Sequence, residues 1–199
     1  MNSQNNIDFF PKLDKPGAGI PYFNRLFLRF FVKPFVAAKT PWKNSEKLFY
    51  RISEKILQET QGLSEEQLRK KVLVKPMRGL EDSSRYWSIA MAIEHLNIVG
   101  KKMAFGISEI SQGRQIAEVA DTAKVKPLGE MSAKQAIEEF RQFVEKDFPR
   151  LAHFVSEKDS SLKYGHPWFG EMSARQWYWL LPMHQNIHLQ QIREIKKSL

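Results

Sequence analysis

The stretch "SARQWYWLLPMHQNIHLQQIREI", residues 173–195, has the pattern of one long helix. Ser173 is followed three residues later by Gln176, the capping-box spacing in which each side chain bonds the other residue's backbone amide. Apolar residues then recur at the heptad-like spacing of a helix-bundle seam, so one face is buried against other helices. The stretch therefore predicts an amphipathic helix that starts after Ser173 and bends at Pro182.

A second helix start resembles this one closely. "GEMSAKQ" at 129–135 matches "GEMSARQ" at 170–176, and it places Ser132 three residues before Gln135. The likeness ends after seven residues, which favours two independent caps over an internal duplication. The helix after Ser132 carries an apolar stripe, and Pro149 is expected to kink it.

Two more long helices and one short helix precede this point. Asn44 can cap a helix that ends near residue 61, and "SEEQLRKK" at 64–71 suits a short helix. Another long helix is expected from near "EDSSRYW" at 81–87 to about Gln112. With four long amphipathic helices and no strand-like alternation after residue 42, the sequence predicts an all-α four-helix bundle over residues 43–199.

Residues 1–42 form a different, partly helical N-terminal extension. If residues 22–33 are helical, Arg25, Arg29 and Lys33 lie on one narrow stripe and aromatic side chains cover the rest. This apolar surface either packs on the bundle or in a dimer interface, or it lies on a membrane surface. The narrow polar stripe favours burial, and its three cations argue against a membrane span.

Composition limits the classes of protein that need to be considered. The 199 residues, 42% hydrophobic and 27% charged, suit one folded domain. Because there is no cysteine, a metal would depend on histidine and oxygen ligands, and a reducing cytoplasmic location is expected. The net charge of +9 is spread along the chain without a nucleic-acid motif, so we expect no nucleic-acid partner.

Three histidines are candidate metal ligands. His184 and His188, four residues apart, face the same way on a helix, and their positions continue the buried seam. His95 occupies the inward stripe of the second long helix, and neighbouring helices of a bundle can bring it opposite the pair. Three neutral imidazoles would leave a divalent ion with open positions, as in catalytic sites. The alternative is a hydrogen-bonded polar core without metal.

The remaining polar residues near these positions suggest less. His153 is expected at an exposed helix end, and His166 is expected to pack in the loop "YGHPWFG" at 164–170. Gln185 follows the first histidine where the zinc-protease motif has a glutamate, and Glu94 is turned about 100° from its neighbour His95. No general base is therefore evident beside the predicted site.

At this point the chain resembles a known family. The stretch "HPWFGEMSARQWYWLLPMHQNIHLQQI", with "WSIAMAIEHLNIVG" upstream, is similar to the DinB-like (YfiT-like) family of four-helix bundles over roughly residues 45–199. The resemblance implies a divalent metal, commonly zinc or nickel, on His95, His184 and His188. It further implies frequent homodimers. Some relatives are S-transferases that use a low-molecular-weight thiol, and others have been described as hydrolases.

The functional hypothesis is therefore a metal-dependent S-transferase or hydrolase acting on a small molecule. A metal-bound thiol loses its proton without a separate base, so thiol activation is easier to support than hydrolysis. Trp87, Met91, Trp177 and Gln191 are the residues that we expect to bind substrate. The alternative is a non-catalytic metal-binding or interaction bundle that docks on a membrane or protein partner.

Overall fold

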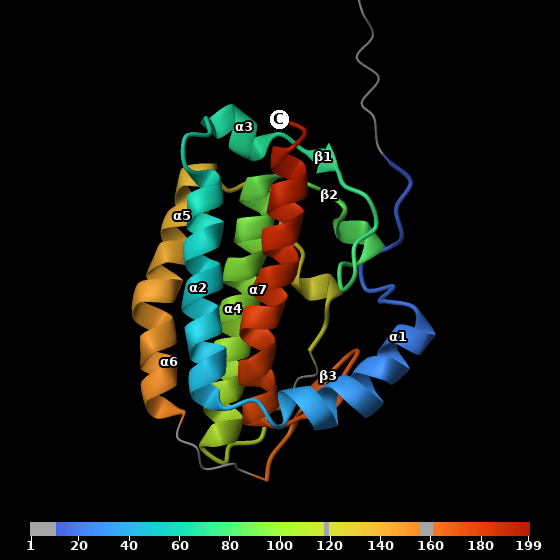
Figure 1. Cartoon of the computed structure of the whole chain (residues 1–199), viewed down its shortest axis with the longest axis vertical. Helices are drawn as coiled ribbons and strands as arrows, with labels where there is room; N and C mark the ends of the chain where they lie inside the picture. The colour runs from blue at the N-terminus through green and yellow to red at the C-terminus, as the bar shows by residue number, and fades with distance from the viewer. Residues whose placement is uncertain (1–10, 118–119, 156–160) are drawn as a thin grey trace, which may run out of the picture.

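An all-α bundle makes up most of this computed structural model, which describes residues 11–117, 120–155 and 161–199. The helical segments are α1 (Tyr22–Phe27), η1 (Leu28–Ala37), α2 (Trp42–Thr60), α3 (Glu65–Arg69), η2 (Asp82–Ser84), α4 (Ile89–Ser111), η3 (Ala123–Val125), α5 (Ala133–Gln142), η4 (Phe143–Asp147), α6 (Phe148–Phe154) and α7 (Ala174–Lys196). The strands are β1 (Val72–Leu73), β2 (Tyr86–Trp87), β3 (Tyr164–His166) and β4 (Gly170–Met172). Helices α2, α4 and α7 stand beside the continuous rod of α5, η4 and α6, which confirms the predicted four-helix bundle (Figure 1).

The predicted serine caps begin two of the four rods. At α7 the box is complete: Gln176 N–H donates to Ser173 Oγ at 3.4 Å, and Ser173 N–H donates to Gln176 Oε1 at 2.9 Å. At α5 only half of it forms, because Gln135 N–H donates to Ser132 Oγ while the Gln135 side chain donates to Glu139. Both helix starts are therefore confirmed, although the second cap is simpler than predicted.

The start of α4 differs from the prediction. The helix begins at Ile89, where the Ser88 hydroxyl accepts a bond from the Met91 amide at 3.1 Å, and not within residues 81–87. Those earlier residues form η2 and then β2, which pairs antiparallel with β1 (Val72 opposite Trp87). A second hairpin joins β3 to β4. Both hairpins have strands of two or three residues, too short to produce a visible alternation.

Three prolines lie at the start of a rod or inside one. Pro41 precedes α2, which begins at Trp42 without a side-chain cap, so Asn44 lies inside its first turn instead of capping it. Pro149 lies in the first turn of α6, directly after the π-helical turns of η4, where its missing amide hydrogen is easily tolerated. Pro182 is buried inside α7, and the helix continues through it.

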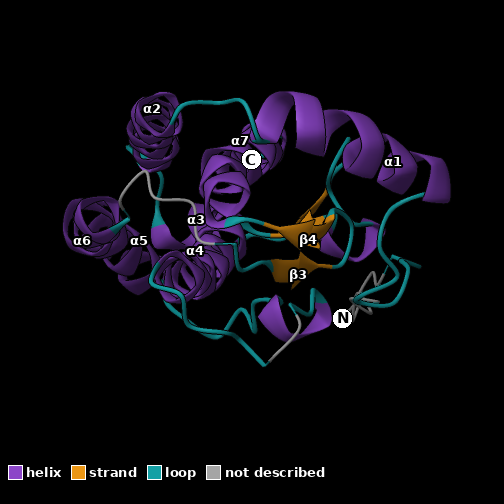
Figure 2. Ribbon diagram, turned by 90° about the horizontal axis from the view of Figure 1, so that it is seen from below, coloured by secondary structure: helices purple, strands orange, loops and turns teal. Residues whose placement is uncertain are grey.

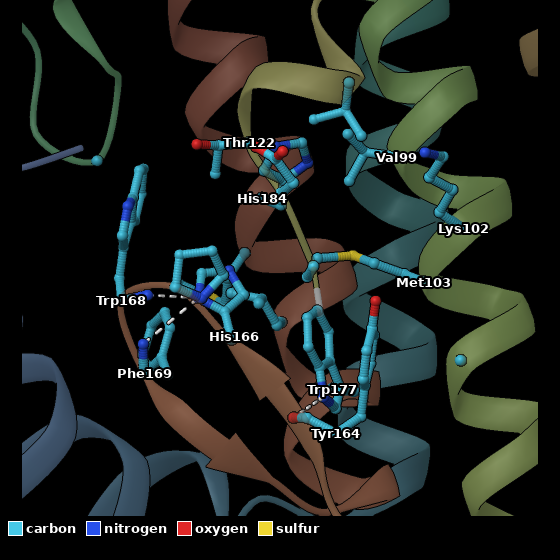
Figure 3. Close-up of a pocket in the computed structure, with 18 of the residues that line it drawn as sticks. Val99, Lys102, Met103, Thr122, Tyr164, His166, Trp168, Phe169, Trp177 and His184 are labelled. Carbon is cyan, nitrogen blue, oxygen red and sulfur yellow. Dashed lines mark hydrogen bonds between the residues drawn. The ribbon is translucent and has the colours of Figure 1, made fainter. Parts of the chain in front are cut away.

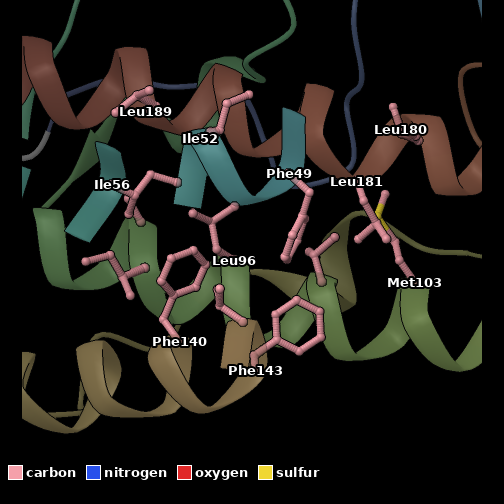
Figure 4. Close-up of a cluster of buried hydrophobic side chains, with 14 of the residues drawn as sticks. Phe49, Ile52, Ile56, Leu96, Met103, Phe140, Phe143, Leu180, Leu181 and Leu189 are labelled. Carbon is pink, nitrogen blue, oxygen red and sulfur yellow. The ribbon is translucent and has the colours of Figure 1, made fainter. Parts of the chain in front are cut away.

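The bundle core combines aliphatic side chains with the phenylalanines Phe49, Phe140 and Phe143 (Figure 4). Phe49 of α2 stacks on Phe148 with ring centroids 3.6 Å apart, and Phe140 and Phe143 are also fully buried. Opposite Phe143, α4 carries Gly100, where an added Cβ would lie 2.8 Å from the ring. A glycine at this position lets α4 approach the neighbouring rod closely enough to exclude water from the core.

The N-terminal helix of α1 and η1 lies across the β3–β4 hairpin, beside the end of α7 where that helix begins (Figure 2). Of the placements considered for its apolar surface, packing of the aromatic side on the bundle is not what the structure has. Arg29 and Lys33 face the bundle and bond to backbone carbonyls of residues 167–171, whereas Phe23 and Phe30 are exposed. None of the helices in the described ranges is both long enough and apolar enough to cross a membrane.

Candidate metal centre

Helices α4 and α7 bring the three predicted histidines into one cluster. Nε2 of His95 lies 3.2 Å from Nε2 of His184, and the His188 ring centroid lies 4.7 Å from each of the other two. One ring nitrogen from each residue falls within 4.8 Å of the others. The cluster can therefore hold a metal ion, and of the described residues it contains histidine alone.

Two hydrogen bonds orient the imidazoles. Nδ1 of His95 lies 2.7 Å from the carbonyl oxygen of Val125, and Nδ1 of His188 lies 2.8 Å from Oε1 of Gln191. The Gln191 amide group donates in turn to the Ser84 carbonyl at 2.7 Å, which fixes its oxygen toward the histidine. Since both partners only accept, both Nδ1 atoms carry the proton, and both Nε2 lone pairs remain available.

Burial keeps these imidazoles neutral. It lowers the pKa values of His95 and His184 well below the ordinary histidine value, and the nearby His188 lowers them further. Burial also lowers the pKa of His188 to about 4, although its bond to Gln191 opposes the shift. The three side chains are thus already deprotonated at neutral pH, as metal ligation requires.

The donor set fits a divalent transition metal. Nitrogens at the usual zinc–nitrogen distance in a tetrahedral site lie about 3.3 Å apart. The 3.2 Å between His95 and His184 already matches this spacing. Hydrogen bonds behind two of the rings reproduce the outer support that is usual around metal-bound histidine.

A cavity of about 1570 Å³ opens beside the cluster (Figure 3). It is lined by all three histidines, by Trp177 of α7 and by the inner side of η1. The indole N–H of Trp177 donates to the Tyr164 carbonyl at 2.9 Å, and the Tyr164 ring stacks on the indole. This part of the wall is therefore held in a fixed position.

His166 also lines the cavity, in addition to packing in its loop as predicted. Its Nδ1 accepts bonds from the backbone amides of Trp168 and Phe169, at 3.0 and 3.4 Å, so the ring proton resides on Nε2 (Figure 3). Burial, followed by the charge of Arg29, lowers its pKa to about 3. His153, in contrast, is exposed near the end of α6, as expected.

The residues that we predicted to bind substrate occupy different places. Trp177 lines the cavity, but Trp87, Met91 and Gln191 do not. Trp87 lies on β2 and stacks against His188, so it packs behind the cluster. Met91 is buried, and Gln191 orients the histidine through its side chain. The sequence spacing predicted that these side chains are buried, but it could not distinguish residues that line the cavity from residues that pack in the core.

Glu94 and Gln185, the polar neighbours of the histidines in sequence, bond to other parts of the chain. Both oxygens of the Glu94 carboxylate accept backbone bonds, from Leu128 at 3.0 Å and Gly129 at 3.1 Å, so this acid fixes a loop. It is buried, and not turned outward. Gln185 exchanges hydrogen bonds with Ser53 of α2 and points away from the cluster toward that helix. The sequence-based expectation of a site without an adjacent helical base agrees with both placements.

The low pKa of His166 predicts a pH-dependent stability. Unfolded histidine titrates near 6.5, so below that pH the unfolded chain binds a proton that the folded ring refuses until about pH 3. Folded-state stability is then complete above about pH 6.5 and declines as the pH falls. Between pH 7.5 and 5.5, we expect the free energy of unfolding of the wild type to fall by about 1 kcal/mol more than that of His166→Gln. Urea unfolding of both metal-free proteins at the two pH values measures this difference. An equal fall in the free energy of unfolding of the two proteins would contradict the prediction.

The fold and the cluster together define a class: a helical bundle with three seam histidines that can hold a metal ion. Residues 48–192 match the DinB superfamily, and the chain belongs to that superfamily, as the resemblance implied. Neither the curated proteins nor the solved structures contain a match to the chain.

Proposed function

We propose that the protein is a metal-dependent enzyme that transfers a small thiol to a small electrophilic substrate. The observation that carries this proposal is the convergence of three neutral imidazoles at the wall of a large cavity. Imidazole nitrogens suit zinc and nickel, so either ion is our candidate cofactor. When bound, such an ion lowers the pKa of a thiol or water and polarises an electrophile.

The chain's own residues would supply orientation and exclusion of water. Val125 and Gln191 hold His95 and His188 with Nε2 free for ligation. His166 carries its proton on Nε2 and would donate a hydrogen bond to an acceptor group of the substrate in the cavity. Trp177, fixed by its bond to Tyr164, would provide an apolar wall against the substrate.

The absence of an available helical base supports a thiol over water as the nucleophile. Both oxygens of Glu94 are bonded to loop amides, so this acid is not placed to take a proton from water, and Gln185 is a neutral amide bonded to α2. A thiol bound to such an ion would lose its proton to solvent without needing a protein base. Hydrolysis of an ester or amide is therefore our second candidate reaction, and it needs a base from elsewhere in the cavity.

The test is a conjugation assay with defined probes. Stripped protein, and protein reloaded with Zn²⁺ or Ni²⁺, would be mixed with cysteine, glutathione or coenzyme A and chlorodinitrobenzene, and the thioether product measured. We expect the loaded protein to accelerate product formation at least about tenfold over the stripped protein, since a metal lowers the thiol pKa. A parallel nitrophenyl-ester assay detects hydrolysis. Metal binding without turnover in either assay would favour the non-catalytic alternative.

A further inference from the structure

The N-terminal helix is fastened to the bundle by its cations. Nε of Arg29 donates to the Trp168 carbonyl at 3.0 Å, and one of its terminal nitrogens donates to the Pro167 carbonyl at 3.3 Å. Nζ of Lys33 donates to the Glu171 carbonyl at 3.1 Å. These bonds turn the polar stripe inward, so the opposite side of the helix must face away from the bundle.

That opposite side carries six large aromatic rings, each between 58% and 80% exposed. We call it the aromatic face: Tyr22, Phe23, Phe27, Phe30, Phe31 and Phe35. Phe27 and Phe31 stack on each other with centroids 5.6 Å apart and form a continuous surface. Contiguous exposed apolar surface of this kind is typical of a site that contacts another molecule or a membrane.

The surroundings of the aromatic face are positively charged. The sequence has no acidic residue between Asp14 and Glu46, whereas it has six basic ones: Lys15, Arg25, Arg29, Lys33, Lys39 and Lys43. None of the six forms an ion pair with any residue of the described ranges. Lys39 is exposed, with Nζ 5.4 Å from the Phe35 ring centroid, at the edge of the aromatic face. Burial, followed by repulsion from Lys163 and Arg29, lowers the pKa of Lys33, and the nearby Glu171 opposes the shift.

We propose that the aromatic face docks the protein on an anionic lipid surface, with the helix lying in the plane of the membrane. An amphipathic helix lying on a membrane buries its apolar side among lipid headgroups and acyl chains, and exposed basic residues beside it pair with acidic headgroups. Lys39 and Lys43 are exposed and can do so, whereas Arg29 and Lys33 are bonded to the bundle. A second copy of the chain fits less well. A twofold contact would oppose the same segment, and therefore the same unpaired cations, on both partners.

The test uses the full chain and two kinds of vesicle, phosphatidylcholine alone and a 7:3 mixture of phosphatidylcholine and phosphatidylserine. Flotation measures the bound fraction. We expect at least tenfold tighter binding to the anionic vesicles, and a steep loss of binding between 0.05 and 0.5 M NaCl. The double variant Phe27→Ser/Phe31→Ser should lose at least tenfold in affinity.

Matched control variants test whether vesicle binding depends on the aromatic face or on any exposed apolar side chain. Leu128→Ser and Phe105→Ser remove exposed apolar side chains outside the N-terminal helix and should bind like wild type. Metal content and thermal unfolding should be unchanged in the double variant, because both rings are exposed. No flotation with anionic vesicles, or flotation that the double variant retains, would overturn the proposal. Sedimentation velocity completes the test: a dimer dissolved by the double variant, without vesicle binding, would assign the face to a second copy.

Discussion

Replacing His95, His184 and His188 together by alanine is expected to lower bound metal from about one ion per chain to background. In the wild-type chain these residues contribute one nitrogen each within 4.8 Å of one another, and no other kind of ligand joins the group among the described residues. Without the imidazoles, this place has no group of three such ligands among the described residues. Elemental analysis of protein reloaded with Zn²⁺ or Ni²⁺ and then desalted measures the difference.

His153→Ala is the matched control, because it removes one exposed histidine from the end of α6 and leaves the cluster intact. It should hold as much metal as wild type. Circular dichroism must show that the triple variant retains its helices. Equal metal content in the folded triple variant and the wild type would exclude the centre as described. Failure of the conjugation assay, by contrast, would leave the metal site standing and reject only the chemistry.

Gln191→Leu is expected to weaken metal affinity about 10- to 100-fold, the usual cost of losing a partner behind a metal-bound histidine. Gln191 is fully buried, accepts a hydrogen bond from His188 Nδ1–H through Oε1, and donates one to the Ser84 carbonyl. Leucine has a similar size but no acceptor. The imidazole would then be free to rotate or to place its proton on Nε2, where it blocks ligation.

Gln190→Leu provides the comparison, since it makes the same chemical change at the exposed neighbouring position. Competition with a fluorescent zinc chelator gives both affinities on one scale. Gln191→Glu retains an acceptor oxygen and should recover most of the affinity. If Gln191→Leu binds zinc as tightly as Gln190→Leu, the orienting role of this side chain is refuted while the histidine cluster itself is not.

The bundle could be predicted from sequence because its signals are local. Ser173 with Gln176, and Ser132 with Gln135, define helix starts within a few residues, and apolar periodicity gives the buried side of each rod. The orientation of the N-terminal helix could not be predicted in this way. Arg29 and Lys33 bond to main-chain carbonyls of a distant hairpin, and no side chain in the sequence reveals those acceptors. The sequence therefore left open which side of this helix contacts the bundle.

The candidate site, too, could be predicted from the sequence only in part. Spacing placed His184 and His188 on the seam with His95 facing them, and the resemblance identified the three as a set. The orientation of His95 depends on the Val125 carbonyl at the end of η3, 30 residues further along the chain, which has no sequence signal. Gln191 lies three residues after His188 on α7, the spacing at which helix side chains meet, so that contact was available to a closer inspection.

A substitution of Gly100 would disturb the histidine cluster on the other side of the same helix. Helix α4 carries His95 toward α7 and, five residues later, presents Gly100 to Phe143 of η4. A methyl group there would approach the Phe143 ring to 2.8 Å, so helix or ring must shift. Ligand geometry at a metal centre tolerates errors of only about 0.5 Å. The close contact between Gly100 and the Phe143 ring thus helps to set the distance between the ring nitrogens of His95 and of the histidines on α7.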